Sequence, residues 1–282
     1  PPPPPPPPTL ELDRRQRQMC IRDRYGDGLF ETIAIRDRQT RFLDWHLERL
    51  ATGCARLGIE LPDTSAVETD IETALRHTGT DPGFAVAKLV VTAGRGPRGY
   101  ARGAARAMHY VAVFASKCLA PRLYRDGVAV RLCNTRLSQQ PQLAGIKSLN
   151  RLEQVLARNE WDDPAIFEGL TCDTAGGLIC GTMSNVFIVA DKEIVTPDLS
   201  RAGVAGIMRR KVLEIAHQHD IRVAIRPIRR ESLSDVREIF LTNSQFGLLP
   251  VRALDRRALE VGDQTRALSA MLVDAGIEEM AC

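Results

Sequence analysis

The stretch Leu143-Ala-Gly-Ile-Lys-Ser-Leu-Asn-Arg-Leu-Glu-Gln-Val-Leu-Ala-Arg158 decides how this chain is interpreted. It carries a single lysine, Lys147, and Pro141 and Gly145 interrupt regular structure before it, so the pattern places Lys147 where a loop meets a helix. Four apolar residues then recur at helical spacing and are expected to bury one face of that helix, namely Leu149, Leu152, Val155 and Leu156.

Two interpretations of Lys147 follow from its setting. A lone lysine is most often a solvated surface charge. This chain, however, is poor in lysine, and Lys147 belongs to no charge run. Burial in an apolar segment lowers the pKa of an amine and makes its neutral, nucleophilic form available. The pattern leaves both interpretations open.

Composition limits the class of protein. A chain of 282 residues suits two domains of ordinary size, and 44% apolar with 26% charged residues is typical of a globular protein. The net charge of +3 is close to balance, and no basic cluster is interleaved with aromatic residues, so we expect no nucleic-acid partner. No apolar run approaches the roughly 18 residues that span a bilayer, so we expect no membrane insertion.

The cysteines and histidines form no metal-binding or disulfide pattern. Seven cysteines are scattered along the chain without a C-x-x-C pair, which argues against a disulfide framework and against a zinc site. Free thiols of this kind fit a cytoplasmic protein. The close pair His217 and His219 is interpreted as the solvated end of a helix.

The first 24 residues stand apart from the rest. Pro1 to Pro8 would form a polyproline II rod without a core, and no apolar signal segment follows. Met19-Cys-Ile-Arg-Asp-Arg24 matches what a transposon end used in sequencing libraries would encode. We therefore expect residues 1–24 to be a non-native, disordered segment, with a genuine proline-rich tail as the alternative, and we begin the fold at Tyr25.

Strand and helix patterns alternate in both halves of the remaining chain, which indicates an α/β or α+β fold. The hydrophilic stretch from Ser116 to Arg125 contains Pro121 and is expected to link two domains. The sequence thus predicts an N-terminal α/β domain over residues 25–120. A C-terminal α/β domain over residues 121–282 would carry Lys147.

Three further segments offer groups that bind anions. Gly203-Val-Ala-Gly-Ile-Met208 opens a helix whose free N–H groups can hold an anion, although such a segment is usually a plain turn. Leu241-Thr-Asn-Ser-Gln245 offers hydroxyls and an amide after a strand, and Arg49 lies on a helix for which Asp44 is the expected N-cap. A held phosphate together with an aldehyde bound by Lys147 is the arrangement that pyridoxal phosphate requires.

The order of six motifs carries a family resemblance. The chain resembles the fold-type IV pyridoxal-phosphate enzymes, which are class IV aminotransferase-like, and within them it is most similar to the bacterial aminodeoxychorismate lyases. The resemblance runs from Tyr25 to about Val251, and its most specific part is Gly145-Ile-Lys-Ser-Leu-Asn-Arg-Leu-Glu153. The other motifs are Tyr25-Gly-Asp-Gly-Leu-Phe-Glu-Thr32, His46-Leu-Glu-Arg-Leu50, Arg95-Gly-Pro-Arg-Gly-Tyr100, Gly181-Thr-Met-Ser-Asn-Val-Phe187 and Ala202-Gly-Val-Ala-Gly-Ile-Met-Arg209.

The resemblance implies a two-domain homodimer that binds pyridoxal phosphate between its domains. Lys147 matches the lysine that binds the cofactor covalently and transfers protons. The other implied cofactor contacts are the Arg49 side chain, the backbone N–H groups of Ile207 and Met208, and the Ser244 hydroxyl. Thr32 and Asn243 would lie near the substrate, and Arg98 and Tyr100 would bind its carboxylate, with the other subunit as one source of that loop.

The implied reaction converts 4-amino-4-deoxychorismate to 4-aminobenzoate and pyruvate, a step of folate biosynthesis. One position departs from the family. A glutamate that keeps the pyridine nitrogen of the cofactor protonated is replaced by Cys180, and a neutral thiol supplies no negative charge. Two alternatives stay open: a branched-chain or D-amino-acid transaminase of the same fold, and an impaired homologue that binds the cofactor.

Overall fold

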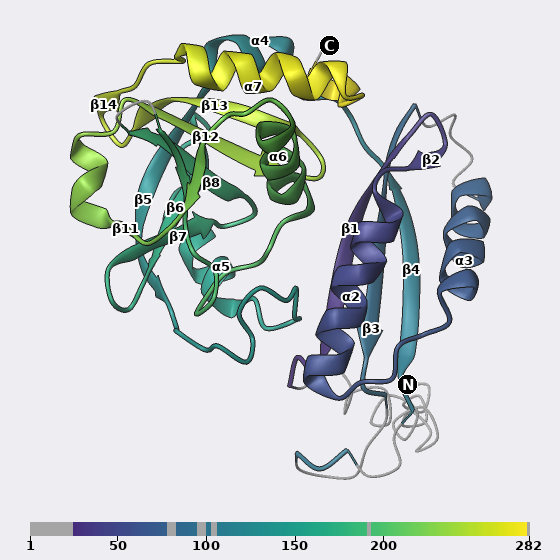
Figure 1. Cartoon of the computed structure of the whole chain (residues 1–282). Helices are drawn as coiled ribbons and strands as arrows, with labels where there is room; N and C mark the ends of the chain where they lie inside the picture. Colours follow the sequence, from purple (N-terminus) through teal and green to yellow (C-terminus); the bar gives the residue numbers. More distant parts are fainter. Residues whose placement is uncertain (1–24, 78–82, 95–99, 103–105, 191–192, 281–282) are drawn as a thin grey trace, which may run out of the picture.

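The structure is a computed structural model that describes residues 25–77, 83–94, 100–102, 106–190 and 193–280. The predicted disordered segment 1–24 lies outside the described residues. Two β-sheets lie side by side, each with helices packed on it (Figure 1). The mixed α/β class predicted from the sequence is confirmed. The domain boundary predicted near residue 120 falls between the last strand of one sheet and the first helix after it, and it stays a prediction.

The smaller sheet is antiparallel and carries two helices. Its strands lie in the order β2 (Gln39–Thr40), β1 (Gly28–Arg36), β3 (Phe84–Thr92) and β4 (Met108–Ala115). The helices α2 (Leu43–Leu57) and α3 (Thr64–His77) pack on this sheet. Alternate residues of β1 point to opposite faces. Leu29 and Ile33 join the core beneath the helices, and Phe30 and Thr32 face the other way.

The start of α2 differs from the prediction. Asp44 was expected to be the N-cap, but it lies within the first turn, where its charge suits the helix dipole. The N-cap is Phe42, which adopts the left-handed conformation with φ 53° and gives no side-chain hydrogen bond to the helix. The ring of Phe42 stacks on Trp45 at a centroid distance of 5.0 Å, so an aromatic contact replaces the polar cap.

The larger sheet is 10-stranded and forms the other half of the molecule. Its main path runs β10-β9-β8-β12-β13-β5-β6-β7-β11, and β14 pairs with β13. The central strands are β5 (Val128–Leu137), β6 (Ile166–Asp173), β7 (Gly177–Gly181), β8 (Asn185–Ala190), β12 (Glu238–Asn243) and β13 (Gly247–Leu254). The shorter strands are β9 (Glu193–Thr196), β10 (Val223–Ile225), β11 (Ile228–Arg229) and β14 (Arg257–Ala258).

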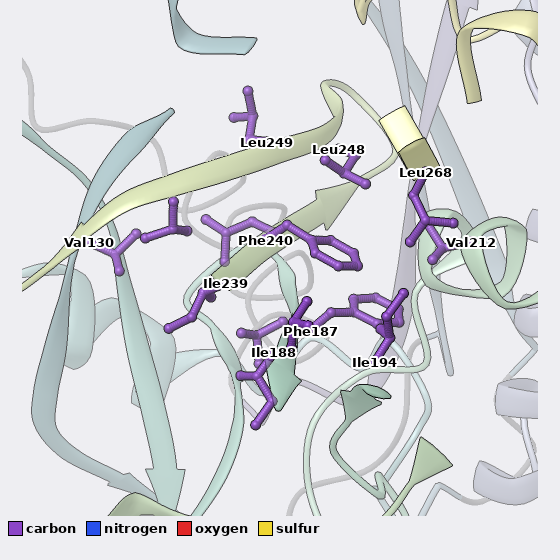
Figure 2. Close-up of a cluster of buried hydrophobic side chains, with 14 of the residues drawn as sticks. Val130, Phe187, Ile188, Ile194, Val212, Ile239, Phe240, Leu248, Leu249 and Leu268 are labelled. Carbon is purple, nitrogen blue, oxygen red and sulfur yellow. The ribbon is translucent and has the colours of Figure 1, made fainter. Parts of the chain in front are cut away.

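Four helices and two 3₁₀ turns accompany this sheet. They are α4 (Pro121–Asp126), α5 (Leu152–Arg158), α6 (Ile207–Gln218), α7 (Asp263–Asp274), η1 (Arg230–Ser234) and η2 (Glu278–Met280). Helices α6 and α7 pack on each other and against β12, and the side chains between them form the main core (Figure 2). The rings of Phe187 and Phe240 stack at 4.7 Å in its centre. No helix among the described residues is long and apolar enough to cross a membrane.

The stretch predicted to be a linker contains a helix, and two local predictions around Lys147 are wrong. The helix is α4, which starts at Pro121 because proline is well suited to a first helical position, and the role of this stretch as a domain linker stays a prediction. Helix α5 begins only at Leu152, so Lys147 lies in an extended segment before it. The face expected to be buried is open in this chain: Leu152, Val155 and Leu156 are 78%, 51% and 61% exposed.

Candidate active site

The backbone around Lys147 is held between the two sheets. Its carbonyl accepts a hydrogen bond of 2.9 Å from the N–H of Phe30 in β1. Two residues earlier, Gly145 bridges to Val204, in the loop that leads into α6, and its N–H donates to the Gly203 carbonyl at 2.9 Å. Lys147 thus occupies a fixed position that both sheets determine.

The Lys147 amine lies over an aromatic ring in a desolvated place. Its Nζ is 4.4 Å from the centroid of the Phe30 ring, and no described residue accepts a hydrogen bond from it. Burial, together with the positive charges of Arg49 and Arg151, lowers the pKa of Lys147 to about 8, although Glu31 opposes the shift. The lowered pKa makes the neutral form of the amine accessible near neutral pH, and this form attacks an aldehyde or takes a proton.

A buried carboxylate holds Arg49 rigidly. Glu31, only 1% exposed, accepts bonds from Nε and Nη2 of Arg49 at 2.8 and 2.5 Å and lies 2.6 Å from Nδ1 of His46. Burial alone would raise the pKa of Glu31, but the charge of Arg49 and the bonds from His46 and Arg49 lower it to about 2. Burial lowers the pKa of His46, so a neutral imidazole donates from Nδ1 to the ionised Glu31.

The start of α6 lies beside Arg49 and is open to an anion. Gly206 is the N-cap, and no side chain caps the helix. The N–H groups of Ile207 and Met208 are therefore available to an anion. Nη1 of Arg49 donates to the Ala205 carbonyl at 2.8 Å. A Cβ on Gly206 would lie 1.9 Å from Oδ1 of Asn185, so only glycine fits there.

Cys180 is a neutral group in this site. It is 6% exposed and pairs across β6 and β7 with Thr171, whose hydroxyl donates to the Cys180 carbonyl at 2.9 Å and lies 3.6 Å from Sγ. Burial raises the pKa of the Cys180 thiol to about 11, against the lowering effects of Thr171, Arg151 and Lys147. At neutral pH the thiol is protonated and carries no charge.

Glu168 lies close to Cys180 but cannot replace the missing glutamate. It is fully buried in β6 and accepts bonds from the N–H groups of Gly169, Thr182 and Met183 and from the hydroxyls of Thr182 and Ser184, at 2.5–3.1 Å. The four donors of Thr182, Met183 and Ser184 fix the turn that follows Cys180. They also leave the carboxylate saturated, so its role in the described residues is structural.

The turn between β12 and β13 carries two further predicted residues. Asn243 donates to the Met183 carbonyl at 2.5 Å, which joins this turn to the one after Cys180. Gln245 donates to the Thr32 carbonyl at 3.3 Å, so Thr32 and Asn243 lie on connected segments. Ser244 lies between them, half-buried, and its hydroxyl has no hydrogen-bond partner among the described residues.

The structure describes only one of the two predicted loop residues. Arg98 lies outside the described residues. Tyr100 is 89% exposed, and its ring packs on Tyr25 at a centroid distance of 5.0 Å. Within one chain the structure gives Tyr100 no place in the site.

Sequence reasoning missed four residues that shape this site: Glu31, His46, Arg151 and Glu168. Glu31 and His46 stood inside quoted motifs, and their signal was a charged or polar residue among core positions of β1 and α2. Arg151 bonds back to the carbonyl and hydroxyl of Ser148 at 3.0 Å each. No cluster of histidine, cysteine, aspartate or glutamate that could hold a metal occurs in the described part of the chain.

Comparison with known proteins identifies the family. Residues 28–254 match the family described as amino-transferase class IV. The chain belongs to this family. A curated class IV relative, the aminodeoxychorismate lyase of Vibrio harveyi, is 33% identical over 253 residues, which cover 88% of this chain and 92% of the relative.

Two other proteins show how wide the class IV likeness is. The solved structure of 4-amino-4-deoxychorismate lyase from Pseudomonas aeruginosa is 45% identical, with a TM-score of 0.81, and the match covers 90% of this chain and 92% of that one. A putative branched-chain-amino-acid aminotransferase of Methanocaldococcus jannaschii is 30% identical over 260 residues, 89% of this chain and 87% of the relative. Lyases and aminotransferases thus share this fold.

Most of the site fits pyridoxal phosphate. The free Lys147 amine suits its aldehyde, and the uncapped start of α6 beside Arg49 suits its phosphate. The position that departs is Cys180, where a neutral thiol stands instead of a carboxylate.

Proposed function

We propose that this class IV chain is a pyridoxal-phosphate-dependent lyase that converts 4-amino-4-deoxychorismate to 4-aminobenzoate and pyruvate. The observation that carries the proposal is the Lys147 amine. It is held by backbone bonds between β1 and the loop before α6, and its pKa is lowered to about 8. The likeness to lyases at 33% and 45% identity over most of the chain favours this reaction over transamination. The product places the reaction in folate biosynthesis.

Different residues of the chain would bind the cofactor, transfer protons and bind the substrate. Lys147 binds the cofactor covalently, and Arg49, Ser244 and the N–H groups of Ile207 and Met208 hold its phosphate. The cofactor, when bound, withdraws electrons from the substrate carbon next to the amine. Once the substrate amine has displaced Lys147 from the cofactor, the neutral Lys147 amine would take the proton from that carbon and return a proton as the pyruvate portion leaves. Thr32 and Asn243 are proposed to contact the substrate, together with Arg98 and Tyr100 of a second copy of the chain, and Cys180 would be a neutral neighbour of the cofactor.

The test is a product assay without an amino-group acceptor. Purified protein with pyridoxal phosphate and 4-amino-4-deoxychorismate should release 4-aminobenzoate and pyruvate in equal amounts when no oxo acid is added. The Methanocaldococcus jannaschii relative motivates the transaminase alternative. That alternative predicts no 4-aminobenzoate and amino-group transfer only when an oxo acid is present, from branched-chain or D-amino acids. Cofactor binding without either activity would support the impaired homologue.

We further propose a homodimer that covers the open face of α5. Leu152, Val155 and Leu156 form an apolar stripe at helical spacing directly after the Lys147 segment, and each is more than half exposed. A second copy would bury this stripe. Sedimentation should give a dimer, and Leu156→Glu should shift it toward monomer, whereas Arg158→Glu on the same helix should not.

The cytoplasm is the proposed location. Reduced cysteines support it, since Cys54, Cys133, Cys172 and Cys180 form no disulfide. Fractionation of expressing cells, with the protein in a compartment other than the cytoplasm, would contradict this proposal.

A further inference from the structure

A buried carboxylate near the C-terminus joins the two sheets. Glu279 lies in η2, after α7, and is 1% exposed. Its Oε2 is 3.6 Å from Nε of Arg36, at the end of β1, and its Oε1 pairs with Nη1 of Arg41, just before α2. The two arginines belong to the smaller-sheet half and are 7% and 10% exposed. One carboxylate therefore forms ion pairs with two nearly buried guanidinium groups.

Arg36 depends on this carboxylate. Its Nη1 donates to the carbonyls of Ile35 and Ala85 at 2.9 and 3.2 Å, whereas its Nε has no hydrogen-bond partner among the described residues. Burial lowers the pKa of Arg36, Glu279 raises it, and the like charge of Arg41 lowers it. Without Glu279, two guanidinium groups would repel each other in a desolvated place.

The same arginine reaches the turn that carries Ser244. Nη2 of Arg36 donates to the Gln245 carbonyl at 2.8 Å. Gln245 in turn donates from its backbone N–H to Oδ1 of Asn243 at 2.8 Å and from its side chain to the Thr32 carbonyl at 3.3 Å. A continuous chain of polar contacts thus runs from Glu279 to the residues on both sides of Ser244.

Packing adds a second connection between the C-terminal segment and this turn. Gly247 ends the turn with φ +71°, and a Cβ there would lie 2.5 Å from Sδ of Met280 and 2.9 Å from Ile277. The N–H of Leu248 lies 3.3 Å from the same sulfur. The segment around Glu279 therefore rests directly on the start of β13.

We propose that Glu279 is a positioning residue for the candidate active site. By neutralising Arg36 and Arg41 it keeps Arg36 bound to Gln245, and this fixes the turn Asn243–Phe246 against β1. Ser244 and Asn243 are thereby held toward the cofactor and the substrate. This role rests on the proposed function, because it concerns the cofactor-binding role of Ser244.

The test compares cofactor affinity in matched variants at a temperature well below unfolding. Glu279→Gln should raise the Kd for pyridoxal phosphate roughly 3- to 30-fold, the range expected for residues that act through a contact network. Turnover at saturating cofactor should stay within about twofold, since Glu279 touches no reacting atom. Glu279→Asp keeps the charge and should restore much of the affinity, and Glu260→Gln, an exposed glutamate of the same half, should change nothing.

A second variant covers the case in which Glu279→Gln does not fold. Arg36→Lys keeps a cation beside Glu279 but loses the second donor that reaches Gln245, so it should weaken cofactor binding in the same way. An unchanged Kd in Glu279→Gln, or in Arg36→Lys where the first variant fails to fold, overturns the positioning role. If the unaltered protein binds no pyridoxal phosphate at all, the proposed function fails instead. The two failures are therefore distinguishable.

Discussion

Two buried acids act electrostatically on Lys147 and behave in opposite ways. Glu31, next to Arg49 and His46, and Cys180, next to Thr171, are both nearly inaccessible, at 1% and 6% exposure, and burial raises the pKa of each. Glu31 is nevertheless ionised, with its pKa lowered to about 2, whereas the pKa of Cys180 rises to about 11. Burial alone therefore does not decide the charge in this site.

The difference comes from direct partners. Glu31 receives two bonds from Arg49 and one from His46, and these outweigh the loss of hydration. Among the described residues, the Cys180 thiol has only the Thr171 hydroxyl, at 3.6 Å, as a partner, and the nearby cation Arg151 bonds to Ser148 instead. The Glu31 side can thus hold an anion firmly through Arg49, while the Cys180 side offers a cofactor ring no negative charge.

Replacing Lys147 should have the largest effect, because both sides act through it. Lys147→Ala removes the amine that binds the cofactor and moves the proton, so turnover should fall by about 10³-fold or more. The visible absorbance band of covalently bound pyridoxal phosphate should disappear. Absorbance spectra and 4-aminobenzoate release measure the two effects.

Lys88→Ala is the matched control for that experiment. Lys88 lies 5.8 Å from the centroid of the same Phe30 ring but is exposed on β3. It should keep the absorbance band. Retention of the band in Lys147→Ala, or its loss in Lys88→Ala, would assign the covalent role to a different lysine.

Removing the ion pair between Glu31 and Arg49 should have the next largest effect. Glu31→Gln leaves Arg49 without its buried counter-ion, so the Kd for pyridoxal phosphate should rise by roughly 10- to 100-fold. The free energy of unfolding should drop by about 3–5 kcal/mol, as expected when one partner of a buried ion pair is removed. Cofactor titration and urea unfolding measure the two quantities.

Acid titration and a surface control sharpen this result. Because the pKa of Glu31 is depressed on folding, its stabilisation is present above its unfolded value of 4.5 and is lost as pH falls toward 2. The unaltered protein should therefore lose more stability than Glu31→Gln across that range. Glu48→Gln, which removes a surface pair with Arg210, should cost at most about 1 kcal/mol. Equal effects of the two substitutions would refute a special role for Glu31.

Local patterns predicted much of the fold because they report what each segment does by itself. The sequence pattern predicts strands over residues 84–92 and 108–115, and the structure shows β3 and β4 with these bounds, Phe84–Thr92 and Met108–Ala115. The glycines before α6 gave its start correctly. For the site, Lys147, Arg49 and the start of α6 could be named from the sequence, and the structure brings them together.

Long-range contacts could not be predicted in the same way. Periodicity shows that one face of α5 is apolar, but not that the rest of the chain leaves it open. The pairing of Glu31 with Arg49 depends on how α2 lies on β1, and the contact of Cys180 with Thr171 depends on the register of β6 and β7. These contacts join segments that are distant in the sequence and determine the charges in the site. Local sequence patterns therefore could not predict those charges.

Restoring a carboxylate on the Cys180 side should have the smallest effect of the three, and the opposite sign. Cys180→Glu places an acid where the charges of Arg151 and Lys147 already act, which favours its ionised form. The carboxylate would favour a protonated cofactor ring, so turnover should rise by about 10-fold with cofactor loading unchanged. Initial rates at saturating substrate, together with absorbance at fixed cofactor, measure this.

Cys180→Ala separates charge from shape at the same position. If the thiol is only a neutral filler, its removal should change turnover by no more than about threefold, because no charge is lost. A rise in Cys180→Glu with no change in Cys180→Ala would show that the chain works with a weakened electron sink. Equal rates in all three proteins would mean that a neutral partner is sufficient here. A loss of turnover in Cys180→Ala would show that the thiol itself takes part in the reaction. Cys180 would then differ from Glu31 in the chemistry of its side chain and not only in its charge.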